Sequence, residues 1–281
     1  INPQGWPVPA LPAAVWQRLP ESDDGLEAAA AAYYGNPNLL PVAGSQAAIQ
    51  ALPACFAPGR VVTLAPTYAE HPHAWCEHQV RALPAEAIDA AVDSADTLLL
   101  VQPNNPDAQR FPRGLLLAWR ERLAARGGRL IVDEAFLDAE PGDSLVPLAA
   151  EPGLVVLRSV GKFFGLAGAR VGFVFAEPAL LARLADRLGP WAVSGPARRL
   201  ARMTSPAPIA YPTDLDGWLA FVAERPAALV FFLWKHQRDG LVAEAEKRKL
   251  RYGVMDGTTS DAMRAELVVR YQAGLLDVLF A

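Results

Sequence analysis

The sequence has few cysteines, no long apolar run and little net charge, and each of these absences excludes a class of protein. Only Cys55 and Cys76 occur in 281 residues, too few for a disulfide framework, so we expect a reducing, cytoplasmic setting. No apolar stretch approaches the roughly 20 residues that span a bilayer, and the start lacks a signal-peptide pattern, so no membrane partner is expected. The formal net charge of −4 gives no general attraction to nucleic acid.

The composition indicates a folded α/β protein. A hydrophobic content of 52% with 20% charged residues is typical of a globular chain. The length suits one large or two ordinary domains. Because the first residue is Ile1 rather than Met, we expect the chain to be a piece of something longer.

Short, continuously apolar runs alternate with helical patterns along the first 200 residues. The runs, which suit strands buried on both faces, are 60–66, 97–102, 129–134, 154–158 and 171–175. The helical patterns lie near 45–56, 69–77, 85–94, 113–126 and 177–188, with an earlier helix reaching Tyr34 that Asp23 or Asp24 caps. This alternation predicts a mainly parallel sheet sandwiched by helices.

Candidate site residues follow these strands. Ligands of such sheets bind outside the carboxyl ends of the strands, and Asn105, Asp133 and Ser159 all come near such ends. Beyond Ser159 come Lys162 and Arg170. An amine, a hydroxyl and a guanidinium suit an aldehyde cofactor that carries a phosphate, which is the chemistry of pyridoxal phosphate.

Other interpretations of Lys162 are a surface lysine at a helix start and two known motifs. Ser-x-x-Lys is typical of serine acyltransferases, but the Ser-Asp-Asn and Lys-Thr-Gly partners are absent. A phosphate loop fails because Val156 and Phe163 stand where glycine and Ser/Thr belong. Asp133 is either a helix cap or the partner of a pyridine nitrogen.

Two further segments fit a phosphate-bearing cofactor. Residues 44–46, Gly-Ser-Gln, open a helix whose free N–H groups favour a phosphate, although ordinary helix starts have the same pattern. Tyr68 either stacks on a cofactor ring or is a half-buried core tyrosine.

The order of these motifs resembles the fold-type-I pyridoxal-phosphate enzymes over residues 1–199. Within them the chain is most similar to the threonine-phosphate decarboxylase family of cobalamin biosynthesis, a relative of histidinol-phosphate aminotransferase. The stretches that carry the resemblance are 1–5 (INPQG), 43–49 (AGSQAAI), 66–68 (PTY), 103–106 (PNNP), 132–136 (VDEAF) and 158–170 (RSVGKFFGLAGAR).

The resemblance implies a role for each matching residue. Lys162 forms the Schiff base and moves the α-carbon proton, Asp133 pairs with the pyridine nitrogen, and Asn105 bonds the ring's 3′ oxygen. Residues 1–5 lie over the substrate, an amino-acid phosphate, O-phosphothreonine, which loses carbon dioxide. The implied cofactor-binding residues are Gly44, Ser45, Gln46, Tyr68, Asn105, Asp133, Ser159, Lys162 and Arg170.

The chain departs from the resemblance in two places. Phe136 stands where many aminotransferases have a tyrosine that bonds the 3′ oxygen, which favours the decarboxylase subgroup. The small domain that supplies an arginine for the substrate carboxylate cannot be followed in the sequence. A histidinol-phosphate type of aminotransferase therefore stays an alternative, and a homodimer is expected from the resemblance.

Residues 215–281, after a proline-rich linker at 200–214, resemble the second motor lobe of Swi/Snf-type helicases. The matching stretches are 228–236, 252–260, Arg264 and 270–279. They predict a small α/β segment with strands at 228–233, 252–255 and 277–280, and helices near 214–225, 236–249 and 260–272. We therefore expect a chimera of two truncated parts. An ATP-dependent nucleic-acid translocase is the alternative of another class, and the missing phosphate loop argues against it.

A metal site is a further alternative for one histidine-rich segment. His71, His73, Cys76 and His78 are close in sequence but lack a regular metal-binding spacing. We expect a helix end with surface histidines instead.

Overall fold

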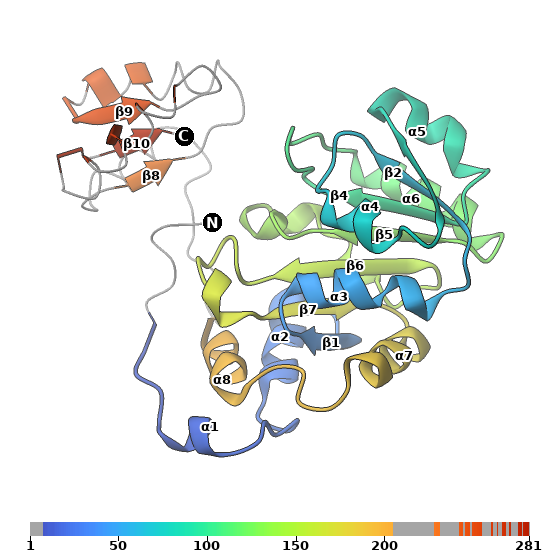
Figure 1. Ribbon diagram of the computed structural model, residues 1–281, viewed down its shortest axis with the longest axis horizontal. Coiled ribbons are helices and arrows are strands. Elements are labelled where there is room, and N and C mark those ends of the chain that lie inside the picture. The colour runs from blue at the N-terminus through green and yellow to red at the C-terminus, as the bar shows by residue number, and fades with distance from the viewer. Residues whose placement is uncertain are drawn as a thin grey trace. The chain divides into compact units, whose positions relative to one another are not determined.

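The computed structural model describes residues 8–204 and parts of the C-terminal region. The latter are residues 228–230, 242–243, 245–247, 249–254, 260, 263, 266–267, 270, 275–276 and 278–280. The chain divides into two compact units, whose main parts are Gly5–Ala207 and Pro208–Ala281 (Figure 1).

A seven-stranded sheet forms the centre of the first unit. Its strands are β1 (Leu39–Val42), β2 (Arg60–Leu64), β3 (Gln79–Leu83), β4 (Thr97–Val101), β5 (Arg129–Asp133), β6 (Leu154–Ser159) and β7 (Gly172–Phe175). The spatial order is β1-β7-β6-β5-β4-β2-β3. Strands β2 to β6 are parallel, and β7 runs antiparallel to both β6 and β1.

The prediction of a mainly parallel sheet is confirmed, and all five predicted apolar runs are strands. The sequence patterns missed β1 and β3, which are the two edge strands. β3 is largely solvent-accessible, and β1 contains Pro41, so neither has the continuous apolar pattern of a central strand.

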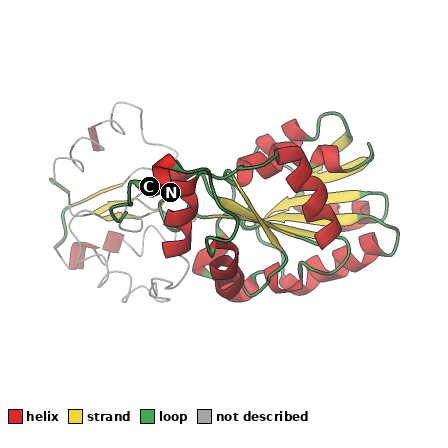
Figure 2. Cartoon of the chain, turned by 90° about the horizontal axis from the view of Figure 1, so that it is seen from below, coloured by secondary structure: helices red, strands yellow, loops and turns green. Residues whose placement is uncertain are grey.

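Helices cover both faces of this sheet (Figure 2). The helices of the first unit are α1 (Ala14–Gln17), which buries no residue, α2 (Leu26–Tyr34), α3 (Ser45–Ala51), α4 (Glu70–Ala74), α5 (Ala85–Val92), α6 (Arg113–Ala124), α7 (Pro178–Leu188) and α8 (Gly195–Thr204). Core residues of α2, α5, α6 and α8 pack on one face, and those of α3 and α7 pack on the other.

The alternation of side chains along each strand assigns neighbouring residues to opposite faces. On β5, Leu130 and Val132 join the core beneath α5 and α6, whereas Ile131 joins the core beneath α3 and α7. By the same alternation Asp133 belongs to the face of α3, and Glu134 to the opposite face. Two adjacent carboxylates therefore enter different environments.

The second unit contains a parallel three-stranded sheet in the order β8-β10-β9. Its strands β8 (Ala228–Val230), β9 (Tyr252–Val254) and β10 (Val278–Phe280) fall within the three strands predicted there.

Helix α8 continues through residues 200–204, and the rest of the predicted linker and the helix at 214–225 lie outside the described residues. The predicted domain boundaries stay predictions. None of the helices in the described part of the chain is long and apolar enough to cross a membrane.

Candidate active site

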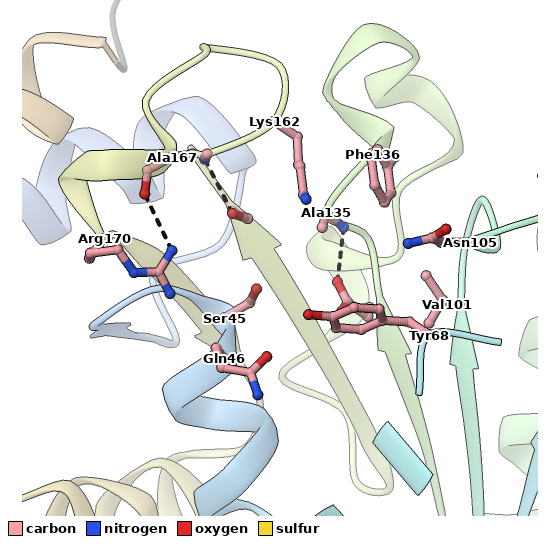
Figure 3. A pocket seen from close by; sticks show the side chains of 13 residues that line it. Ser45, Gln46, Tyr68, Val101, Asn105, Ala135, Phe136, Lys162, Ala167 and Arg170 are labelled. Atoms are coloured by element: carbon pink, nitrogen blue, oxygen red, sulfur yellow. Dashed lines mark hydrogen bonds between the residues drawn. The ribbon is translucent and has the colours of Figure 1, made fainter. Parts of the chain in front are cut away.

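A cavity of about 250 Å³ opens at the carboxyl edge of the first unit's sheet. Thirteen residues line it (Figure 3), and eight of the nine predicted cofactor-binding residues are among them. Those eight are Ser45, Gln46, Tyr68, Asn105, Asp133, Ser159, Lys162 and Arg170. Gly44 lies directly behind the cavity wall, against the Arg170 guanidinium. The fold thus brings together residues that are far apart in the sequence, from Ser45 to Arg170.

Three strand ends supply the floor of the cavity. Val101, Asp133 and Ser159 are the last residues of β4, β5 and β6, and all three line the cavity. The register pairs Val101 with Asp133, so these strands end at the same level. The register pairs Asp133 with Leu157, two residues before Ser159, so β6 extends slightly further into the cavity than β5.

Asp133 is held in a fixed orientation by two donors. Its Oδ1 accepts a hydrogen bond of 3.0 Å from the Ala135 N–H, and its Oδ2 lies 2.9 Å from Nε2 of His71. His71 is 1% exposed and Asp133 is 3% exposed. The expectation of surface histidines is wrong for His71, because α4 turns this side chain inward against the strand end.

The remaining members of the histidine-rich segment do not join His71. His73 and Cys76 are exposed, and Nδ1 of His78 accepts a hydrogen bond from the Gly59 N–H. No group of three or more metal-ligating side chains gathers within the described part of the chain. No pattern in the local sequence distinguished His71 from the neighbouring histidines.

One end of the cavity is suited to an anion. Gly44 has a left-handed φ of 75°, and a Cβ added there would lie 2.6 Å from Nη2 of Arg170. The guanidinium therefore packs against the Gly44 backbone at the start of α3, a position that only glycine leaves open. Ser45 and the buried Ser159 add hydroxyl groups at the same end. This combination of cation, hydroxyls and close backbone fits a phosphate group.

Lys162 enters the cavity from the loop after β6. In Figure 3 its amine points into the space between Ser45 and Arg170 on one side and Asn105 on the other. The Nζ atom lies 5.2 Å from the centre of the Phe136 ring. The Lys162 amine thus shares the cavity with the anion site at Arg170 and with the Asp133 carboxylate. From this position the amine can react with an aldehyde bound in the cavity.

Two aromatic residues form the open rim. Tyr68 is 39% exposed and Phe136 is 40% exposed, although both line the cavity. Burial, with smaller contributions from Glu70 and Asp133, raises the pKa of Tyr68. Tyr68 is not a core residue, which leaves the interpretation of a residue that covers a bound ring.

Gln46 has a partner of its own. Its Nε2 donates a hydrogen bond of 2.5 Å to Oε2 of Glu70, the first residue of α4. This bond connects the start of α3, at the anion end, with the helix that carries His71. The Gln46 backbone remains the group that the resemblance assigns to the phosphate.

A buried ionic cluster lies on the opposite face of the same two strands. Arg158 donates to Glu134 at 3.0 Å and to Asp138 at 2.6 Å, and all three side chains are at most 1% exposed. Burial raises the pKa of both carboxyls, which Arg158 opposes. Burial also disfavours the charged form of Arg158, but Asp138, Tyr34 and Glu134 more than offset this and raise its pKa. The cluster therefore joins the ends of β5 and β6 beneath Asp133 and Ser159.

The sheet order, the helices on both faces and the cavity at the carboxyl edge define an aminotransferase-like α/β fold. The chain belongs to the aminotransferase class I and II family, whose model matches residues 16–211. A curated relative from Pseudomonas aeruginosa, "Threonine-phosphate decarboxylase", is 56% identical over 204 residues. These cover 72% of this chain and 62% of the relative, so the chain spans less than two thirds of that protein.

Two solved structures share the fold. L-threonine-O-3-phosphate decarboxylase from Porphyromonas gingivalis has a TM-score of 0.63 at 24% identity, covering 75% of this chain and 67% of that one. Histidinol-phosphate aminotransferase from Sinorhizobium meliloti, solved in complex with pyridoxal-5'-phosphate, has a TM-score of 0.59 at 21% identity. It covers 84% of this chain and 65% of that one. The family match ends at residue 211, and the resemblance of residues 215–281 to a helicase lobe stays a prediction.

Proposed function

We propose that this chain binds pyridoxal phosphate in the cavity and forms the large domain of a threonine-phosphate decarboxylase. The observation that carries the proposal is the convergence of Lys162, Asp133 and Arg170 on one cavity with an anion site at one end. The similarity to a curated decarboxylase supports the choice of substrate class. The reaction breaks the bond between the α-carbon and the carboxylate of O-phosphothreonine, releases carbon dioxide and adds a proton to the α-carbon.

Bound pyridoxal phosphate supplies a protonated ring that withdraws the electron pair left on the α-carbon. The role of Asp133 is to keep the ring nitrogen protonated, with its carboxylate held by His71 and the Ala135 N–H. Arg170, together with the hydroxyls of Ser45 and Ser159, binds the phosphate. Holding the cofactor at both ends would fix the plane of its ring, and the groups that anchor the substrate would then decide which of its bonds stands perpendicular to that plane and breaks.

Lys162 has two roles in this proposal. Its amine would hold the cofactor through its aldehyde carbon, and the same amine would be the group that donates the proton to the α-carbon of the substrate. Phe136 lacks the hydroxyl that a tyrosine would direct at the ring oxygen, so Asn105 alone of the predicted residues serves that oxygen. Tyr68 covers the ring on the open side.

The test uses a feature of the sequence. Lys162 is the only lysine in residues 1–204, so a borohydride-fixed lysine adduct in that part of the chain has one side chain on which to form. Added pyridoxal phosphate is expected to give a visible absorbance band, and peptide mass spectrometry after reduction should locate it on Lys162. Lys162→Ala should abolish the band, whereas Lys249→Ala should keep it. A band that persists unchanged in Lys162→Ala contradicts the assignment.

Turnover separates decarboxylation from the aminotransferase alternative. Carbon dioxide release from O-phosphothreonine, without any requirement for a keto acid, supports the decarboxylase. Keto-acid-dependent loss of the amino group supports a histidinol-phosphate type of enzyme instead. The expected homodimer is tested by sedimentation, where a monomer alone would contradict it.

A further inference from the structure

A buried asparagine next to the cavity connects two of the loops that form it. Asn104 is 4% exposed and is not among the residues that line the cavity. It directly precedes Asn105, which does line it. We propose that Asn104 is a positioning residue that clamps the loop carrying Tyr68 to the loop carrying Asn105. This inference rests on the proposed function of the cavity.

The side chain of Asn104 bonds both loops. Its Nδ2 donates to the Pro66 carbonyl at 2.8 Å and to Oδ1 of Asp107 at 2.6 Å. Its Oδ1 accepts a bond of 2.9 Å from the Thr67 hydroxyl. Both amide hydrogens and one acceptor lone pair are therefore used. Two of the three bonds reach Pro66 and Thr67, the residues immediately before Tyr68.

The backbone of Asn104 is equally constrained. Its N–H donates to the Gln109 carbonyl at 2.9 Å, and its carbonyl accepts from the Ala108 N–H at 2.8 Å. Asp107 Oδ1 also accepts from the Gln109 N–H. These bonds close residues 104–109 into one turn. The turn is therefore a rigid base from which the side chain of Asn104 holds the neighbouring loop.

The sheet explains why one residue can reach both loops. β2 and β4 are hydrogen-bonded neighbours and parallel, so the loops that follow them leave the sheet side by side. Tyr68 lies on the first loop and Asn105 on the second. In Figure 3 the two side chains lie on the same side of the cavity. The clamp therefore fixes the residue predicted to cover the ring relative to the residue predicted to bond the ring oxygen.

The test compares amide deletions in two matched places. Asn36 is 3% exposed, donates to the Val146 carbonyl at 2.7 Å and accepts from the Asn38 N–H, and it does not line the cavity. Asn104→Ala, Asn104→Asp and Asn36→Ala are made in the full chain. Pyridoxal phosphate affinity is measured by absorbance titration, and ring orientation by visible circular dichroism per bound cofactor.

Both Asn104 variants are expected to weaken cofactor binding about tenfold, the equivalent of one hydrogen bond of roughly 1.4 kcal/mol, and to change the dichroism. Asn104→Asp keeps the shape but replaces both donors with an acceptor that faces the Pro66 carbonyl and the Asp107 carboxylate, so it reverses the hydrogen bonds without changing the packing volume. Asn36→Ala should destabilise the fold without changing affinity more than twofold. If the Asn104 variants do not fold, Thr67→Val removes a single bond, and a change in its dichroism supports the clamp.

The outcomes are distinguishable. If the unmodified chain forms no absorbance band with pyridoxal phosphate, the proposed function fails and the clamp's role toward the cofactor fails with it. If the unmodified chain binds cofactor but the Asn104 or Thr67 variants match it in affinity and dichroism, only the clamp is overturned. Equal losses in Asn104→Ala and Asn36→Ala also overturn it, since the effect would then be one of general stability.

Discussion

Replacing Arg158 by methionine tests how the buried cluster beneath the site stabilises the fold. The substitution keeps a long, apolar side chain but leaves Glu134 and Asp138 buried without their cation. Breaking a buried ion pair by removing one partner costs about 3–5 kcal/mol, because an uncompensated charge remains. For a unit of this size, roughly 2–4 °C of melting temperature accompanies each kcal/mol. We expect the melting temperature of Arg158→Met to lie about 6–20 °C below that of the unmodified chain.

Arg122→Met is the matched control. Arg122 also bonds two carboxylates, Asp89 and Asp93, at 2.6 and 2.7 Å. Its side chain is 34% exposed and the two carboxylates are more than 60% exposed. Exposed pairs contribute at most about 1 kcal/mol. The same substitution with the same number of ion pairs should therefore lower the melting temperature several times less.

The pH dependence follows from the sign of the pKa changes. Burial raises the pKa of Glu134 and Asp138 above their usual values, and loss of Arg158 removes the charge that opposes this. A carboxyl whose folded-state pKa is raised favours folding when protonated and loses that contribution as the pH rises. The deficit of Arg158→Met should therefore be smaller near pH 4 than at pH 7.

Thermal unfolding followed by tryptophan fluorescence measures these differences, since Trp75 and Trp119 are buried in the first unit. A triple variant in which Glu134→Gln and Asp138→Asn accompany Arg158→Met removes the uncompensated charge and should recover most of the loss. Equal midpoints for Arg158→Met and Arg122→Met, or a triple variant as unstable as the single one, would refute the reasoning.

Three further substitutions test other features. Gly44→Ala places a methyl group against Arg170 and strains a residue with a left-handed φ. The affinity for pyridoxal phosphate, measured by absorbance titration, should therefore fall about tenfold. Gly189 has a similar φ but open surroundings, so Gly189→Ala should leave this affinity unchanged. His71→Leu removes the buried partner of the Asp133 carboxylate, so it should weaken the binding of pyridoxal phosphate. An affinity equal to that of the unmodified chain would contradict this role of His71. Hydrogen bonds from Arg60 lower the pKa of Asp96 from 3.8 to about 2. The ionised carboxylate therefore stabilises the fold above pH 3.8, and this stabilisation is lost as the pH falls toward 2. In urea titrations Asp96→Asn should lose under about 1 kcal/mol of unfolding free energy at pH 7 and match the unmodified chain near pH 2.

The central strands could be predicted because each is buried on both faces and therefore apolar throughout. The edge strands β1 and β3 could not, since their sequences have no such pattern. Asn105, Asp133 and Ser159 were predictable because parallel strands end at one edge of the sheet, whereas the full set of cofactor-binding residues was implied by the family resemblance. His71 was missed because nothing in its local sequence shows that α4 turns it inward to Asp133.

The amino-acid sequence by itself determined the alternation of strands and helices, the family to which residues 16–211 belong, and the set of residues that gather at the sheet edge. These features follow from local patterns in the sequence. Strands buried on both faces are apolar throughout, and a glycine stands at residue 44, where the backbone lies against the Arg170 guanidinium. Only the tertiary structure decided which partners the polar side chains find. The alternation of a strand sends Asp133 to His71 and Glu134 to Arg158, and the pairing of β2 with β4 brings Asn104 to Thr67. Such contacts join residues far apart in the chain, so they exist only once the sheet has formed.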